Sequence, residues 1–569
     1  MLRRLNNAVR EHRAKRLNAG GLRLWQHGDL HAAETSLREA ARLRPAAAGT
    51  LSNLGMVLLA QGRFDEGMAI LKQAVEAAPA HSGALNNLGV AYARGNNPAS
   101  AAKYLLRAVA ADPDNAEAHA NLLRPLMEIC DWQRVDALCA QLVALAAHAP
   151  LAEWAPRLHP YTALLVDLPA TLQRDAARWY AAQLPRRKAP VRRGTADSRR
   201  IRIGYVSADL QNHATAQLCA GMFERHDRTR FEVTAYSSGA DDGSAYRKRI
   251  REGCDRFVDI GSEPYADTAR RIETDGIQIL VDMKGYCGDS RPEIFALRPA
   301  PLQVSFLGYP GSLHADFMDY IVADRSVIPA ETVADYAEAP LWMPGSYQVN
   351  DAAQPVDARV PSRAECGLPA DAFVYCCFNQ SYKIDRATFE LGLRVLRAVP
   401  ASVLWLYRSN VQAKYALWKH ADRAGVARER IVFAPHHEKP QHLARLRLAD
   451  LFLDTFVVNA HTTASDALYA GVPVLSCPGR TFASRVATSL LHAAGLPELV
   501  MPDRSAYERR AVELAQNPAA MRAIRHNLDD ERCTAPLFDT AAYVRALDTA
   551  YERIWLQYLK EEPPAPIAP

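Results

Sequence analysis

Residues 451–471, LFLDTFVVNAHTTASDALYAG, give the strongest indication of the fold. An apolar run leads through a polar turn into a helical pattern that Gly471 closes. Thr462 and Thr463 can cap this helix, whose unpaired N–H groups and dipole form an anion site suited to a diphosphate. A strand that runs directly into such a helix is the unit of a parallel α/β sheet.

Two more side chains of this segment extend the predicted site. Asp466 lies four residues after Thr462 and therefore on the same helix face, where its carboxylate can accept hydrogen bonds from two ribose hydroxyls. His461 stands at the phosphate edge. A capped helix after a strand is also common where no ligand binds. The neighbouring motifs therefore have to show whether this segment has a binding role or a structural one.

Short β-branched runs alternate with helical stretches on both sides of this segment. The alternation predicts two Rossmann-like lobes, 201–360 and 361–538, that face each other across a cleft, followed by a C-terminal helix at 539–561 and a disordered tail at 562–569. The expected strands are 201–207, 231–236, 278–283, 303–307 and 320–323 in the first lobe and 373–378, 403–407, 431–434, 451–454 and 472–476 in the second.

The first part of the chain has a different period. Pro45, Pro79 and Pro113 lie 34 residues apart, the spacing of tetratricopeptide repeats. Three units are clear, and a fourth is degenerate because Pro125 lies inside it. We expect an all-α repeat solenoid at 1–148, then a helical and basic linker at 149–200.

Three asparagines, Asn53, Asn87 and Asn121, recur at the same 34-residue period. They fall on the first helix of their repeats and should form a row along one wall of the solenoid. Such a row of amides can hold an extended peptide backbone. The alternative is that asparagine is tolerated on a solvated face; the repetition favours a peptide groove.

The motif FNQSYKID, residues 378–385, places Gln380 and Lys383 in a loop after a strand. The Lys383 ammonium can stabilise the charge on a departing nucleoside diphosphate without a metal. The single Asp-x-Asp, Asp112–Asp114, lies at a repeat boundary, so the acidic magnesium clamp is missing from the lobes. We expect neither a metal nor a cofactor; a surface lysine is the alternative.

Three basic residues, Lys439, His442 and Arg445, follow the strand that ends at Ala434 at three-residue spacing. The spacing puts them near one face of a helix, where they could clamp a base and a ribose. An exposed basic helix face is the competing interpretation.

The first lobe offers His213 at the end of the motif IRIGYVSADLQNH and the turn LGYPG at 307–311. Imidazole could accept a proton from an attacking hydroxyl, although a lone histidine is more often structural. The glycines of the turn let backbone groups approach a sugar ring, and a plain tight turn is the alternative.

The bulk composition agrees with a folded chain of several domains. The 569 residues are 49% hydrophobic, and the formal charge of +5 is too small and dispersed for a nucleic-acid binder. Ten cysteines without metal spacing, no secretory signal and no run of eighteen apolar residues favour a cytoplasmic protein without a membrane partner.

Four motifs in order, at 204–213, 296–312, 378–385 and 448–491, resemble the O-linked N-acetylglucosamine transferase family, which joins tetratricopeptide repeats to a GT-B type catalytic unit. The resemblance implies inverting, metal-independent transfer of N-acetylglucosamine from UDP-N-acetylglucosamine to serine or threonine of a protein acceptor. UDP-binding positions would be Gln380, Lys383, Ala434, Lys439, His442, Arg445, His461, Thr462, Thr463 and Asp466. Leu307, Gly308 and Pro310 would adjoin the sugar, and His213 the acceptor hydroxyl, as base or beside a substrate-phosphate or water relay.

Two features depart from the animal members of the family: the repeats are few, and the long insertion between the lobes is missing. A shorter groove leaves the range of acceptors open. Two other functions stay in competition, namely a repeat-based scaffold with a vestigial UDP site, and another UDP-sugar enzyme, an epimerase or a small-acceptor transferase, on the same fold.

Overall fold

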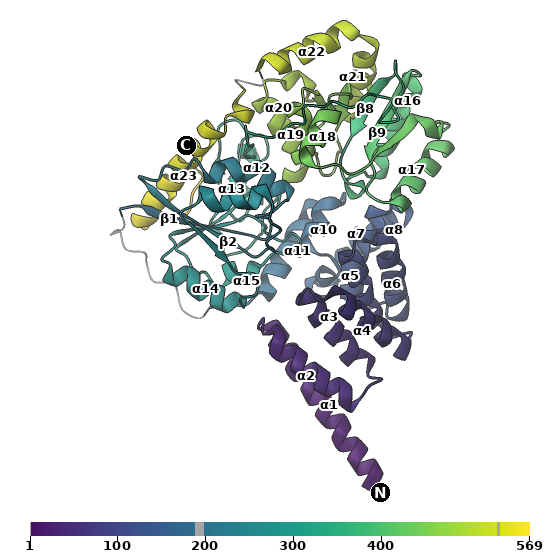
Figure 1. Cartoon of the computed structure of the whole chain (residues 1–569), viewed down its shortest axis with the longest axis vertical. Helices are drawn as coiled ribbons and strands as arrows, with labels where there is room; N and C mark the ends of the chain where they lie inside the picture. The colour runs from purple at the N-terminus through teal and green to yellow at the C-terminus, as the bar shows by residue number, and fades with distance from the viewer. Residues whose placement is uncertain (1, 188–198, 532–534, 569) are drawn as a thin grey trace. The chain divides into compact units, whose positions relative to one another are not determined.

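The computed structural model describes residues 2–187, 199–531 and 535–568. The chain divides into two compact units, one of residues 1–162 with 263–268 and the other of residues 163–262 with 269–569 (Figure 1).

The first unit is a series of antiparallel helix pairs, which confirms the predicted all-α repeat region. The helices are α1 (Leu2–Gln26), α2 (Leu30–Leu43), α3 (Ala48–Ala60), α4 (Phe64–Ala77), α5 (Ser82–Arg94), α6 (Pro98–Ala111), α7 (Ala116–Glu128) and α8 (Trp132–His148), followed by the short α9 (Leu151–Trp154). Each of the three periodic prolines lies in the turn between one pair and the next, where no helical N–H is lost.

Close helix approach within a pair explains the glycines of the repeat. A Cβ on Gly55 would lie 2.6 Å from Cγ of Leu71, and one on Gly89 would lie 2.6 Å from Cγ of Leu105. A larger residue at either position would collide with the leucine of the facing helix, so that the leucine or the helix would have to shift. The equivalent position in the fourth pair is Leu123, in keeping with its degenerate sequence.

The second unit contains two parallel sheets. The first lobe has the strand order β3-β2-β1-β4-β5-β6-β7, and the second has the order β10-β9-β8-β11-β12. The strands are β1 (Ile201–Ser207), β2 (Phe231–Ser237), β3 (Arg256–Asp259), β4 (Ile279–Asp282), β5 (Leu302–Ser305), β6 (Tyr320–Ala323), β7 (Ala339–Trp342), β8 (Phe373–Cys377), β9 (Ser402–Tyr407), β10 (Ile431–Ala434), β11 (Leu451–Leu453) and β12 (Val474–Leu475).

Helices connect these strands in both lobes. In the first lobe they are α12 (Ala214–Phe223), α13 (Ala245–Gly253), α14 (Tyr265–Thr274) and α15 (Pro292–Ala296); in the second they are α16 (Arg386–Ala398), α17 (Val411–Arg423), α18 (Lys439–Leu446) and α19 (Thr462–Tyr469). After the last strand, β12, come α20 (Val486–Ala493), α21 (Arg504–Gln516) and α22 (Pro518–Glu531). The strand order reverses between β1 and β4 and again between β8 and β11. Ligands bind at such switch points, outside the carboxyl ends of the strands.

Sequence reasoning missed two strands, β3 and β7, and both lie at the edges of the first sheet. Strand β3 is four residues long and incompletely buried, with charged ends. Strand β7 contains Pro340, which an edge strand tolerates because one of its sides needs no N–H donor.

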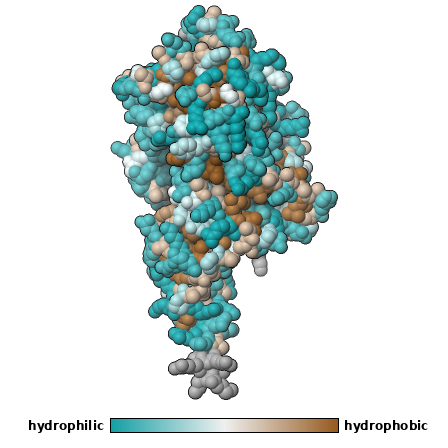
Figure 2. Space-filling view, turned by 90° about the vertical axis from the view of Figure 1, so that its right-hand side faces the viewer, coloured by the Kyte–Doolittle hydropathy of each residue, from teal (hydrophilic) through white to brown (hydrophobic). Residues whose placement is uncertain are grey.

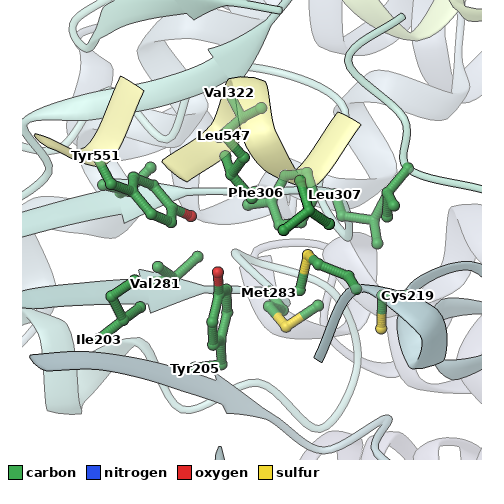
Figure 3. Close-up of a cluster of buried hydrophobic side chains, with 14 of the residues drawn as sticks. Ile203, Tyr205, Cys219, Val281, Met283, Phe306, Leu307, Val322, Leu547 and Tyr551 are labelled. Carbon is green, nitrogen blue, oxygen red and sulfur yellow. The ribbon is translucent and has the colours of Figure 1, made fainter. Parts of the chain in front are cut away.

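The C-terminal helix α23 (Thr540–Leu559) belongs to the core of the first lobe. Figure 3 shows Leu547 and Tyr551 among side chains of the sheet such as Tyr205 and Val281. Asp548 on the same helix is buried and its Oδ1 lies 2.5 Å from Nδ1 of His226. The first lobe is therefore built from both ends of the second unit.

The prediction of a disordered tail at 562–569 is wrong for the part that the structure describes. Ile567 donates its N–H to the Pro340 carbonyl at 3.0 Å, and its own carbonyl accepts from the Trp342 N–H at 2.8 Å. The open edge of β7 supplies the backbone groups that order this proline-rich segment.

The predicted linker is more than a solvated connector. It contains α10 (Pro160–Leu165) and α11 (Ala170–Gln183), and Tyr180 of α11 packs edge-on against Tyr286 of the first lobe at 4.8 Å between centroids. Arg187 pairs with Glu273 at 2.9 Å. The basic residues Lys188, Arg192 and Arg193, and Pro190 among them, lie outside the described residues.

On the face drawn in Figure 2, hydrophilic residues surround smaller groups of hydrophobic ones. None of the helices in the described part of the chain has the length and apolar character needed to cross a membrane.

Replacing Leu547 with alanine should lower the stability of the second unit by about 2–5 kcal/mol, because the side chain is fully buried in the first-lobe core. Urea unfolding of the full chain measures the change. Leu556→Ala on the same helix is the matched control: this side chain is 55% exposed, and its loss should cost no more than about 0.5 kcal/mol. Equal losses for the two variants would contradict the assignment of α23 to the core.

Candidate nucleotide site between two Rossmann-like lobes

The switch point of the second sheet brings two predicted motifs together. Nζ of Lys383 donates to the Asn459 carbonyl at 2.9 Å, and Oγ1 of Thr463 donates to Oδ1 of Asn379 at 2.6 Å. The loop after β8 and the turn between β11 and α19 thus form one surface. The lysine ammonium lies near His461, the N-cap residue of α19.

Capping of α19 differs from the prediction. The helix starts at Thr462, its N-cap residue is His461, and no side chain caps it. Thr462 and Thr463 are therefore the first residues of the helix, and both are partly exposed. An uncapped first turn leaves backbone N–H groups and the positive end of the helix dipole for an anion.

His461 is held at this helix start in its neutral form. Burial, and then the neighbouring Lys383 ammonium, lower the pKa of its imidazole well below the ordinary value, and the ring hydrogen bonds to the backbone of Ala483. Its Nε2 is buried and makes no hydrogen bond to any described residue. A buried polar atom without a partner fits a site that a polar ligand completes.

The turn itself rests on Asp454, which sequence reasoning did not select. Its Oδ1 accepts the N–H groups of Ala460 at 2.6 Å and Thr455 at 2.8 Å, and its Oδ2 accepts the Ser476 hydroxyl at 2.6 Å. Burial raises the pKa of this carboxyl to about 7. An acidic residue directly after a buried strand is the signal that could have identified it.

The predicted ribose and base residues form one buried cluster. Lys439 pairs with Asp466, and Nε2 of His442 lies 3.9 Å from Oδ2 of the same carboxylate. Arg445 donates from Nη1 to the Pro435 carbonyl, next to Ala434 at the end of β10, at 2.5 Å. These contacts exclude an exposed basic helix face as the explanation of the spacing.

Burial dominates the electrostatics of this cluster. It raises the pKa of Asp466 and lowers the pKa of Arg445 to about 10. The pKa of His442 falls well below the ordinary value because of burial and then the Arg445 and Lys439 charges. Nδ1 of His442 lies 3.0 Å from Nη2 of Arg445, so a neutral imidazole can accept there. Gln380, by contrast, is exposed in the loop after β8.

In the first lobe, His213 is the N-cap of α12. Its Nδ1 accepts the Thr215 N–H at 3.2 Å, and 47% of its side chain is exposed. The adjacent Asn212 donates from Nδ2 to Oε2 of Glu438 in the second lobe at 3.3 Å. Helices α12 and α19 are in contact, so His213 and the uncapped helix start adjoin the same lobe boundary (Figure 1).

A cavity of about 670 Å³ opens at this boundary. Both lobes line it, the first through Asn212, Tyr246 and Arg249 and the second through Glu438 and Lys439. It therefore reaches the Lys439–Asp466 pair, and its volume suits a small-molecule ligand.

The predicted sugar turn is only partly open to a ligand. The Leu307 side chain lies in the first-lobe core (Figure 3), and its φ of +70° is unusual for a bulky residue. Gly308 donates its N–H to the Phe306 carbonyl at 2.9 Å, and a Cβ there would lie 2.1 Å from the Met283 carbonyl. Pro310 is buried. A sugar contact at Leu307 would have to come from its backbone.

The asparagine row of the repeat unit is half-buried and bridges consecutive repeats. Nδ2 of Asn53 donates to Oδ1 of Asn18 at 3.0 Å, Nδ2 of Asn87 to the Ser52 hydroxyl at 2.9 Å, and Nδ2 of Asn121 to Oδ1 of Asn86 at 3.0 Å. These amides thus have a structural role, which sequence reasoning did not anticipate.

Two Rossmann-like lobes and a tetratricopeptide region define a GT-B type protein of the glycosyltransferase class. The chain matches glycosyl transferase family 41 over residues 129–358 and 353–547, and the tetratricopeptide repeat family over residues 18–82 and 52–116. Because the first match covers well over half of its length, the chain belongs to glycosyl transferase family 41.

Two curated proteins similar to this chain are both named as peptide N-acetylglucosaminyltransferases. A probable UDP-N-acetylglucosamine–peptide N-acetylglucosaminyltransferase SEC of Arabidopsis thaliana is 35% identical over 453 residues, which cover 76% of this chain and 46% of that protein. A UDP-N-acetylglucosamine–peptide N-acetylglucosaminyltransferase of Caenorhabditis elegans is 29% identical over 553 residues, covering 76% and 48%. The chain thus spans about half the length of these relatives.

A solved structure is similar over almost the full chain. It is a point mutant of the Thermobaculum terrenum O-GlcNAc transferase, with a TM-score of 0.69 and 26% identity over 98% of this chain and 99% of that one.

The Asp454 carboxyl should make stability depend on pH. Because its pKa is raised in the folded state to about 7, its contribution is complete below the unfolded value near 4 and is lost as the pH rises through about 7. Asp454→Asn keeps the shape without the titration. The free energy of unfolding of the wild type relative to this variant should therefore fall, by a few kcal/mol in order of magnitude, between pH 4 and 8. Denaturant titrations at each pH measure it, and a difference that does not vary with pH would refute the assignment.

Proposed function

We propose that the protein transfers N-acetylglucosamine from UDP-N-acetylglucosamine to serine or threonine hydroxyls of a protein acceptor, with inversion and without a metal. The observation that carries the proposal is the shared surface of Lys383 and the start of α19, because it supplies cationic and N–H donors for a diphosphate. The names of the relatives support the donor and the acceptor class.

On the donor side, the buried carboxylate of Asp466 would accept from the ribose hydroxyls while Lys439 holds it in position. His442 and Arg445, with the backbone near Ala434, would face the uracil. These groups are already fixed by their mutual contacts, so that binding needs little reordering of side chains.

Negative charge on the leaving diphosphate would meet two sets of donors, the Lys383 ammonium and the N–H groups of Thr462 and Thr463. His461 would lie at the phosphate edge as a neutral ring whose N–H is engaged by the Ala483 backbone. Gln380 lies in the same loop as Lys383. Donors placed in advance stabilise charge that develops in the transition state without reorganisation, which is the role a metal ion fills elsewhere. We accordingly propose no metal or cofactor for the reaction.

The acceptor hydroxyl would approach from the His213 side of the cleft, near the turn of Leu307, Gly308 and Pro310. The tautomer of His213 limits its role. While Nδ1 accepts from Thr215, the proton of the neutral ring resides on Nε2, so Nδ1 is the nitrogen that can take up a proton, through a water relay. Nε2 could accept a proton directly only in the other tautomer, in which Nδ1 carries the hydrogen and no longer accepts from Thr215.

Lys383→Met should reduce kcat by about 10²- to 10³-fold, because one preplaced donor to the leaving group is lost. Turnover of UDP-N-acetylglucosamine with a peptide library measures the effect, and calorimetry with UDP reports the donor site separately. Lys419→Met, on the exposed face of α17, is the matched control and should change neither quantity. Full activity of the Lys383 variant would exclude the proposed leaving-group site.

Replacing Asn53, Asn87 and Asn121 with alanine should raise KM for a long peptide acceptor and leave UDP affinity unchanged, if the row binds peptide backbone. The control removes only the partners, through Asn18→Ala, Ser52→Ala and Asn86→Ala, so that the same bonds between repeats are lost while the row stays intact. An equal rise in KM for both triple variants would assign the asparagines to repeat stacking alone.

A further inference from the structure

A buried ion pair lies at the switch point of the first sheet, outside the set of residues used above. Asp209 follows β1 and Lys284 follows β4, its neighbour in the sheet. Nζ of Lys284 lies 2.9 Å from both carboxylate oxygens of Asp209, and the two side chains are only 11% and 9% exposed. A pair in this position stands where a doubly wound sheet places its ligand.

The same carboxylate faces His213. Oδ2 of Asp209 lies 3.4 Å from Nδ1 of His213 and accepts the Thr215 hydroxyl at 3.2 Å. Nδ1 accepts the Thr215 N–H at 3.2 Å. Two states therefore compete: a neutral ring that accepts from Thr215, and an imidazolium that donates from Nδ1 to Asp209.

We propose that Asp209 and Lys284 are positioning residues for His213, with Lys284 compensating the Asp209 charge so that His213 stays a neutral ring seated on Thr215. This inference rests on the proposed function, in which His213 adjoins the acceptor hydroxyl. Neither residue needs to touch a substrate; both act through the imidazole.

The charges around His213 agree with this arrangement. Burial lowers its pKa, the Asp209 carboxylate raises it, and the Lys284 ammonium lowers it again. Two other carboxylates near the loop are engaged by Asn212 instead: Asp242 accepts its N–H at 2.7 Å, and Glu438 accepts its side chain. Lys284 is thus the cation that opposes Asp209 at the ring.

The consequence is chemical. A neutral ring seated on Thr215 keeps its lone pair on Nδ1, which can take up the proton of an attacking hydroxyl through water and then donate to Asp209, whereas an imidazolium has no free nitrogen. If Lys284 were absent, the carboxylate of Asp209 would stabilise the imidazolium and shift the active form to higher pH.

The test is a histidine titration of the full-length protein by NMR, with ¹³C-labelled histidine and His213→Gln to identify the signal. We expect Lys284→Met to move the His213 midpoint to higher pH and Asp209→Asn to move it to lower pH. The double variant should fall between the two, and it leaves no buried charge unpaired. Lys248→Met removes an exposed lysine of the same lobe and should leave the midpoint at the wild-type value.

Enzyme kinetics give the second readout. Lys284→Met should lower kcat at neutral pH, recover it at higher pH, and leave KM for the UDP-sugar unchanged, whereas damage to the fold would not recover with pH. Unmoved midpoints, or midpoints in the reverse order, would overturn the proposal. If Lys284→Met does not fold, the His213 midpoints of the wild type, Asp209→Asn and the double variant still test the proposal. Of these three proteins, Asp209→Asn should have the lowest midpoint. The midpoints could also shift as expected in a protein that has no transferase activity. That result would support the electrostatic coupling of Asp209 and Lys284 to His213, but it would overturn the proposed function and the catalytic relevance of the pair.

Discussion

The second lobe depends on how its two central strand ends are joined. Lys383, in the loop after β8, donates to the Asn459 carbonyl in the turn before α19. The Asp454 carboxylate accepts the Ala460 N–H of the same turn. Because this connection is made by buried or half-buried groups, the helix start cannot move independently of the lysine. Ammonium and helix dipole therefore act on the same small volume, where their fields add.

The two lobes use the same topology for different purposes. In the second lobe, the switch point between β8 and β11 exposes an uncapped helix and a lysine, which suits an anion. In the first, the switch point between β1 and β4 is closed by the Asp209–Lys284 pair, and the partly exposed His213 lies outside it. The same fold thus presents positive charge at the switch point of one lobe and a neutral polar group at that of the other.

Much of this was predictable because the relevant signals are local. Buried strands such as β8 and β11 are continuous apolar runs, and the 34-residue period is visible in three prolines. Sequence reasoning missed the edge strands β3 and β7 because both are short, β3 is incompletely buried, and β7 contains a proline. The role of Lys284 depends on Asp209, 75 residues away in the sequence, which spacing does not reveal. Asp454 had a local signal, its position directly after a buried strand, that sequence reasoning did not use. The assignment of Thr462 as a cap failed because the helix starts one residue earlier than the polar turn suggests.

The return of α23 and Ile567 to the first lobe also affects how the chain is made. Leu547, Tyr551 and Trp555 complete a core whose other members are translated up to about 350 residues earlier. On the ribosome, the first lobe must wait, with part of its apolar interior uncovered, until the whole second lobe has emerged. The order of synthesis thus makes the second lobe the earlier one to finish, and makes a nascent first lobe a natural client for chaperones.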